Sequence, residues 1–182
     1  MAHFAVTAVG ADRPGIVAAV SNAFVEHGCN IEDSAMTILR GQFAMMLIVA
    51  APQGLAAPAL KAALAAPALE LGLTVTVEPV SSTEVRQELP AGGASTYTVS
   101  VHGADHPGIV HGIADLLARA AVNIIDLTTR VIGGTESPVY VMMLEVSLPP
   151  TVDADDLRAR LDNVAQELGV TANLHPSEAD IL

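Results

Sequence analysis

The chain has 182 residues, of which 51% are hydrophobic, enough to build the interior of one domain or of two small ones. Twenty acidic residues against eight scattered basic ones give a net charge of −12. Because this charge repels the phosphate backbone, we expect no direct binding of DNA or RNA. The longest apolar run, Phe43 to Ala51, is too short to cross a membrane, and the N-terminus lacks a secretory signal pattern, so we expect a cytoplasmic protein.

Apolar spacing in the first half of the chain predicts strands and helices in a definite order. Alternation predicts an opening strand, and a period of about four residues then predicts a helix. The alternating residues are Phe4, Val6 and Ala8, and the periodic ones are Ile16, Val20 and Phe24. Two strands joined by a turn, a second helix and a final strand follow at residues 31–39, 43–50, 55–71 and 74–78. Because Pro67 lies inside the second helix, we expect that helix to be kinked or shortened.

A polar segment separates this half from the rest of the chain. Residues 80–95, VSSTEVRQELPAGGAS, are rich in Gly, Ser and Pro, which is typical of a linker. The sequence therefore predicts a first domain at residues 1–79 and a second at residues 96–182.

The second half repeats the first. GADRPGIV at residues 10–17 returns as GADHPGIV at residues 103–110, a separation of 93 positions. FAMMLIV from Phe43 matches YVMMLEV from Tyr140 at a separation of 97. The second copy has therefore gained four residues, which we place in the turn around Gly133, Gly134 and Pro138 because hairpin turns tolerate insertions.

The elements of the second half follow in the same order. Strands are expected around residues 97–101, 124–132, 139–148 and 171–175. One helix is expected after the repeated phrase, and another is expected to begin after Asp153. Strand, helix, strand, strand, helix, strand is the split βαβ pattern. We predict an α+β fold of two ferredoxin-like βαββαβ units, each a four-stranded antiparallel sheet with both helices on one face.

The sheet face opposite the helices differs between the two predicted units. The first presents Ala5, Thr7, Val9, Met46 and Ile48, and the second presents Thr98, Ser100, His102, Met143 and Glu145. The more apolar first face is expected to pack against the other unit or a second subunit, although isolated surface aliphatic residues are also common.

The repeated phrase is the candidate ligand site. Pro14 and Pro107 suit the first position of a helix, where a missing N–H costs nothing. The amides that follow would point out of the helix end, together with the positive end of its dipole, and could hold a carboxylate. These amides belong to Gly15, Ile16, Gly108 and Ile109.

Two further pairs of side chains complete the candidate site. Asp12 and Asp105 could attract an ammonium group, so that the turn as a whole would suit a zwitterion. Asn30 and Asn123 open the strand that follows the helix, and we expect them near the same turn, offering both a donor and an acceptor. The alternative is that these residues only form a stable strand-to-helix connection.

The two segments GADRPGIVAAVSNAFVEHGCNIEDSAM and GADHPGIVHGIADLLARAAVNIIDLTT resemble the signature of ACT domains, which are small modules that sense amino acids. The layout of two copies and a linker is similar to the glycine cleavage system transcriptional repressor family. The resemblance implies ligands at interfaces between paired modules, contacted by the turn and by the start of the next strand. The residues it implies are Gly10, Asp12, Pro14, Gly15 and Asn30, and Gly103, Asp105, Pro107, Gly108 and Asn123. Several amino-acid-binding members have histidine at the two glycine positions and asparagine at the two aspartate positions.

Taken together, these features predict a non-enzymatic, cofactor-free amino-acid sensor that forms a homodimer. Glycine or a similar small amino acid is the expected ligand, by resemblance. A protein partner, such as a DNA-binding regulator, would carry the signal, because the chain has no basic face of its own.

Three other functions remain open from the sequence. The chain could be a regulatory subunit that docks on a metabolic enzyme, or an assembly module without a ligand. It could also be an enzyme that uses His102, His106 and His111 with Asp105 to bind a metal or transfer a proton.

Overall fold

The computed structural model describes residues 2–81, 94–133 and 138–177, which divide into two compact units, residues 1–88 and 89–182. Most of the predicted linker and of the turn around Gly133, Gly134 and Pro138 lies outside the described residues.

The first unit contains four strands and two helices in the predicted order. Their bounds are β1 Ala2–Ala11, α1 Ile16–Glu26, β2 Asn30–Leu39, β3 Gln42–Ala51, α2 Ala57–Leu71 and β4 Leu73–Val80. In the second unit the bounds are β5 Ser95–Ala104, α4 Ile109–Arg119, β6 Asn123–Ile132, β7 Val139–Leu148, α5 Ala154–Glu167 and β8 Val170–Pro176.

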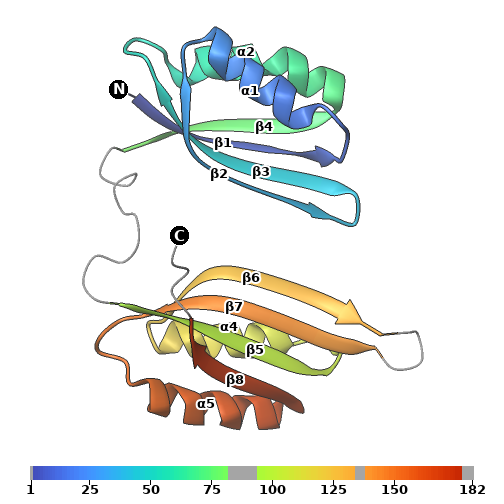
Figure 1. The fold of residues 1–182 in the computed structure, drawn as a ribbon, viewed down its shortest axis with the longest axis vertical. Coiled ribbons are helices and arrows are strands. Elements are labelled where there is room, and N and C mark those ends of the chain that lie inside the picture. Colours follow the sequence, from blue (N-terminus) through green and yellow to red (C-terminus); the bar gives the residue numbers. More distant parts are fainter. Residues whose placement is uncertain (1, 82–93, 134–137, 178–182) are drawn as a thin grey trace. The chain divides into compact units, whose positions relative to one another are not determined.

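Each unit is a four-stranded antiparallel sheet with both helices on one face (Figure 1). The strand order is β2-β3-β1-β4 in the first unit and β6-β7-β5-β8 in the second. This confirms the predicted fold of two ferredoxin-like units. Because the strand that opens each unit lies inside its sheet, the turn that follows it is held by a strand on either side.

Alternation along the opening strands sets the two faces of each sheet. Phe4, Val6 and Ala8 are buried against the helices, as expected, while Val9 on the other face is 47% exposed. The outer faces also follow the prediction, because Met46 pairs with Thr7 in the first sheet and Met143 pairs with Ser100 in the second. The first outer face is therefore the more apolar of the two.

A β-bulge interrupts the second strand of each unit at the same place. The pairing of β2 with β3 shifts between Ile31 and Asp33, and that of β6 with β7 shifts between Ile124 and Asp126. The extra residue on the bulged strand changes which face the residues before it present.

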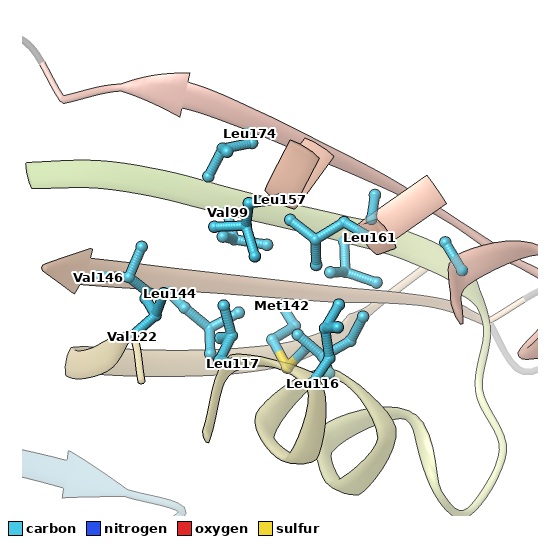
Figure 2. Close-up of a cluster of buried hydrophobic side chains, with 14 of the residues drawn as sticks. Val99, Leu116, Leu117, Val122, Met142, Leu144, Val146, Leu157, Leu161 and Leu174 are labelled. Atoms are coloured by element: carbon cyan, nitrogen blue, oxygen red, sulfur yellow. The ribbon is translucent and has the colours of Figure 1, made fainter. Parts of the chain in front are cut away.

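The two units have separate hydrophobic cores. In the second core, Leu116 and Leu117 on α4 lie close to Met142 on β7, and Leu157 on α5 lies close to Val99 on β5 (Figure 2). Burying each large aliphatic side chain contributes roughly 1.5–3 kcal/mol, which fixes the helices on the sheet and so fixes the turns where α1 and α4 begin.

The expectation that Pro67 shortens the second helix was wrong, whereas the expected kink stays a prediction. Helix α2 continues past Pro67 to Leu71 and ends at Gly72, whose φ of 68° is left-handed. Pro67 cannot donate to the carbonyl one turn earlier, but the fully buried Leu60 and Leu64 hold the helix on the sheet.

Candidate functional site

The repeated phrase lies at one end of each sheet, where three connections meet. In the first unit, Gly10 pairs with Phe43 on one side and Leu73 on the other, and the Asp12 amide donates to the Gly41 carbonyl at 2.8 Å. The Asp12 turn, residues 12–15, therefore lies beside the β2–β3 hairpin and the start of β4. The Asp105 turn, residues 105–108, has the equivalent place in the second unit, because Gly103 pairs with Tyr140 and Val170.

The helices begin two residues later than the prolines, so the expected place of Pro14 and Pro107 at the first helical position was wrong. Gly15 and Gly108 are the N-caps of α1 and α4. Their φ angles of 96° and 104° are left-handed and interrupt the helical path after each proline. Glycine adopts such angles without a steric penalty, which explains its place in both copies.

The later start changes which amides are available. Intrahelical bonding begins with the Ala19 amide, which donates to the Gly15 carbonyl at 2.9 Å. The amides of Ile16, Val17 and Ala18 precede it and receive no side-chain cap; we call them the opening amides of α1. Those of α4 belong to Ile109, Val110 and His111. Of the amides predicted from the sequence, those of Ile16 and Ile109 are among the opening amides, whereas Gly15 and Gly108 are the N-caps. The opening amides of Val17, Ala18, Val110 and His111 were not predicted.

Open space adjoins both N-caps. A Cβ placed on Gly15 or on Gly108 would meet no atom within 4 Å. A small molecule can therefore approach the opening amides of either helix from the side of the glycine.

Gly10 and Gly103 are explained by packing within the fold. A Cβ on Gly10 would lie 2.7 Å from the Gly72 carbonyl oxygen, and one on Gly103 would lie 2.8 Å from Cγ1 of Val170. A larger side chain at Gly10 or at Gly103 would displace the start of β4 or of β8, respectively. Both glycines thus meet a packing requirement of the fold, and their contact with a ligand stays a prediction.

The two aspartates lie on their turns with exposed side chains. The Asp12 carboxylate forms no hydrogen bond or ion pair with any other described residue. Asp105 contributes to raising the pKa of His106, and it adds to the effect of burial in raising the pKa of Tyr140 on β7. Both carboxylates remain available to a cation in solvent.

Asn30 and Asn123 lie far from the turns of their own units, contrary to the expectation. Asn30 pairs with Ala50, whereas Gly10 pairs with Phe43. The seven positions from Phe43 to Ala50 span roughly 23 Å at about 3.3 Å per residue. Asn123, opposite Ser147, is equally far from Gly103, opposite Tyr140. A small molecule cannot contact the turn and the asparagine of one unit together.

His106 is held by two backbone carbonyls. Its Nδ1 lies 3.0 Å from the Pro107 oxygen and its Nε2 lies 2.6 Å from the Leu168 oxygen at the end of α5. These hydrogen bonds, the one to Pro107 foremost, raise the pKa of His106 despite partial desolvation. Among the described residues, no group of three or more histidine, cysteine, aspartate or glutamate side chains could hold a metal ion.

Two cations of the first unit were not singled out from the sequence. Arg13 lies in the Asp12 turn, and Arg40 lies in the β2–β3 hairpin next to Gly41, whose carbonyl accepts from the Asp12 amide. Both side chains are exposed. In a chain of net charge −12, they place positive charge near the opening amides of α1. The Arg-Gly pair, which is typical of a tight turn before β3, was the available sequence signal.

The second strand of each unit is an exposed sheet edge. All ten residues of β2 are exposed, including Met36, Ile38 and Leu39 at 50%, 48% and 66%. In β6 the exposed apolar residues are Ile125, Leu127, Val131 and Ile132. Apolar edge strands without a cover are sites at which another strand can add.

The comparisons with known proteins agree with the repeated architecture. A family model described as ACT domain matches residues 2–78 and again residues 95–175. Within the described part of the chain, no helix has the length and apolar character needed to span a membrane.

Individual relatives match over different lengths. The chain is 24% identical over 175 residues to the glycine cleavage system transcriptional repressor of Escherichia coli, covering 95% of this chain and 89% of that protein. It is 53% identical over 49 residues to the UPF0237 protein of Methanopyrus kandleri, covering 27% of this chain. That second match spans about half of the relative, 54% of its length.

A solved structure matches over nearly the whole chain. The crystal structure of an unknown protein from Galdieria sulphuraria has a TM-score of 0.81 at 26% identity, covering 97% of this chain and 99% of that one.

Proposed function

Because this chain belongs to the ACT domain family, with two copies of the domain, we propose that it is a non-enzymatic regulatory protein that senses a small amino acid. Glycine is the first candidate ligand. The similarity to the E. coli glycine cleavage system transcriptional repressor supports a role in controlling genes of glycine or other amino-acid metabolism.

The observation that carries the proposal is that an exposed carboxylate lies beside the opening amides at both turns. The opening amides of α1 and α4 adjoin open space and lie at the positive end of a helix, which favours the carboxylate of an amino acid. Asp12 and Asp105 supply the negative charge that an ammonium group needs. A zwitterion combines both charges within a few ångströms.

A second copy of the chain would complete the site. If two exposed β2 edges pair antiparallel, the start of each strand lies beside the end of the other. Asn30 of one copy then reaches the sheet end that carries the Asp12 turn of the other copy. The same pairing of β6 edges would bring Asn123 to an Asp105 turn. We therefore propose a homodimer whose interface uses these edges and includes the ligand.

Signalling would pass through another protein. Ligand binding regulates a partner only if the ligand favours one arrangement of the protein over another. With a net charge of −12, the chain is expected to reach DNA only through a DNA-binding regulator. A catalytic role is not proposed, because both ring nitrogens of His106 already contact backbone carbonyls.

Isothermal titration calorimetry and thermal shift with each of the twenty amino acids test this proposal. We expect a small amino acid, glycine first, to raise the melting temperature and to bind at two sites per chain. Asp12→Ala should abolish one site, Asp105→Ala the other, and the double variant both. Glu70→Ala on α2 and Asp162→Ala on α5 remove an exposed acid elsewhere and should leave binding intact.

The test also separates the remaining functions. Binding that survives the double variant would place the ligand elsewhere, and no response to any amino acid would favour an assembly module. If binding occurs, ligand-dependent capture of a metabolic enzyme instead of a DNA-binding regulator would identify a regulatory subunit.

A further inference from the structure

The two turns differ at one chemically important position. The residue between the aspartate and the proline is Arg13 in the first unit and His106 in the second. Arg13 is exposed and forms no hydrogen bond or ion pair with another described residue. His106 instead bridges the Pro107 carbonyl of its own turn and the Leu168 carbonyl, at 3.0 Å and 2.6 Å.

Both contacts can be hydrogen bonds only when the imidazole carries two protons. A carbonyl oxygen accepts and never donates, and a neutral imidazole has a single N–H. With one proton, the second nitrogen would point its lone pair at a carbonyl oxygen. The observed geometry is therefore complete only for the imidazolium form.

The far end of the bridge is a fixed point of the fold. Leu168 is the C-cap of α5, where the negative end of the helix dipole favours a cation. Its side chain packs where Gly112 on α4 has no Cβ, because an added Cβ would lie 2.9 Å from Cδ1 of Leu168. The carbonyl that holds His106 thus belongs to a residue that also joins the two helices.

We propose that protonated His106 is a latch that holds the Asp105 turn against the end of α5, and that its deprotonation releases this turn while the Asp12 turn is unaffected. His106 is in this sense a positioning residue. The first unit has no equivalent latch, because Arg13 stays charged throughout the physiological pH range.

One charged group on the same turn favours the protonated form of the latch. Asp105 acts on His106 directly, as an additional cause of its raised pKa. The other titratable groups on the surrounding elements are His102 on β5, His111 on α4, Tyr140 on β7 and Glu167 on α5.

The direction of the pH effect follows from the raised pKa. The latch contributes stability that is fully present below the ordinary histidine value of about 6.5 and is lost as the pH rises through the folded-state pKa of His106. If the Asp105 turn binds an amino acid, as the proposed function holds, the imidazolium also adds positive charge beside the opening amides. Affinity at that turn should then fall over the same pH range.

Two measurements on the full-length protein without any ligand test the latch. NMR titration of the imidazole resonances, assigned with His106→Gln, should place the His106 midpoint above about 6.5. Thermal melts between about pH 5 and pH 8 should show that His106→Gln lowers the melting temperature at the acidic end and leaves it unchanged at the basic end. His102→Gln, which changes an exposed histidine on β5, should reproduce the wild-type profile.

Each outcome decides between the alternatives. A His106 midpoint at or below the ordinary value, or a loss in His106→Gln that is equal at every pH, overturns the latch. The ligand arm uses Asp12→Ala, in which only the Asp105 turn can bind, and follows glycine affinity across the same pH range. Absence of glycine binding there contradicts the proposed function but not the latch, whereas affinity independent of pH contradicts the latch's control of the ligand.

Discussion

Glycine residues meet two different requirements at each turn. Gly15 and Gly108 adopt left-handed φ angles that start the helices late and expose the opening amides. Gly10 and Gly103 have no such angle, but the neighbouring strand leaves no room for a Cβ. In the sequence all four positions are simply glycine. The structure shows which two are required for a left-handed φ angle and which two for lack of space.

Substituting Gly103 should reveal the close approach of β8. In Gly103→Ala the new methyl group would lie 3.1 Å from the Cα of Val170, a backbone atom that cannot move aside. We expect a loss of about 1–3 kcal/mol in the free energy of unfolding, measured by urea denaturation.

Gly112→Ala is the matched control in the same unit. Its methyl group would meet side-chain atoms of Leu168 and no backbone atom of another element, and alanine gains about 1 kcal/mol over glycine inside a helix. The free energy of unfolding should change little. Equal losses in the two variants would show that the close approach to Val170 is not the cause.

Side chains involved in the candidate site were easier to predict than their backbone partners. The aspartates were identified from the repeated phrase, and both lie on the turns. The contact between His106 and Leu168 could not be predicted, because every residue has a carbonyl and the sequence does not indicate which one accepts.

Secondary structure followed the apolar periodicity closely. The alternation of Phe4, Val6 and Ala8 and the helical period of Ile16, Val20 and Phe24 predicted elements at the observed places. Errors arose where a single residue type was interpreted alone: Pro14 as the first helical residue and Pro67 as the cause of a shortened helix. At both places packing and the backbone angles of nearby glycines decided the outcome.

Pro67 should be a correctable weak point of α2. Pro67→Ala restores the N–H that can donate to the Ala63 carbonyl, and we expect the free energy of unfolding to rise by up to about 3 kcal/mol in urea denaturation. Pro58, in the first turn of the same helix, is the control, since no intrahelical bond is missing there. If Pro58→Ala stabilises equally, the cause is the unfolded chain and not the missing bond.

The fold of both units could be predicted because the repeat is visible in the sequence. Each half alone is ambiguous, but two halves with the same order of elements specify two ferredoxin-like units. The prediction that Asn30 lies near the Asp12 turn of its own unit failed because of the overall path of the chain. Helix α1, with 11 residues, returns the chain by about 16 Å to the far end of the sheet. Because Asn30 follows the C-terminal end of α1 in the sequence, it lies far from the Asp12 turn, which precedes the N-terminal end of that helix.

Net charge should make the proposed homodimer sensitive to salt. Two chains of net charge −12 repel each other, and raising the ionic strength from about 0.01 M to 0.15 M shortens the screening length from about 30 Å to 8 Å. We expect the dimer dissociation constant to fall over this range, as measured by sedimentation equilibrium. A weaker dimer at higher salt would instead indicate an interface of oppositely charged side chains.

The bulge shared by β2 and β6 restricts how these strands can evolve. Because of it, Asn30 lies on the same face as Ala50 and His3, whereas an uninterrupted strand would turn the asparagine beneath α1. Point substitutions leave this orientation alone, but the loss of one residue, such as Glu32, would rotate the amide by half a turn. The bulge in β6 has the same consequence for Asn123, so a deletion in either strand would change the face that its asparagine presents.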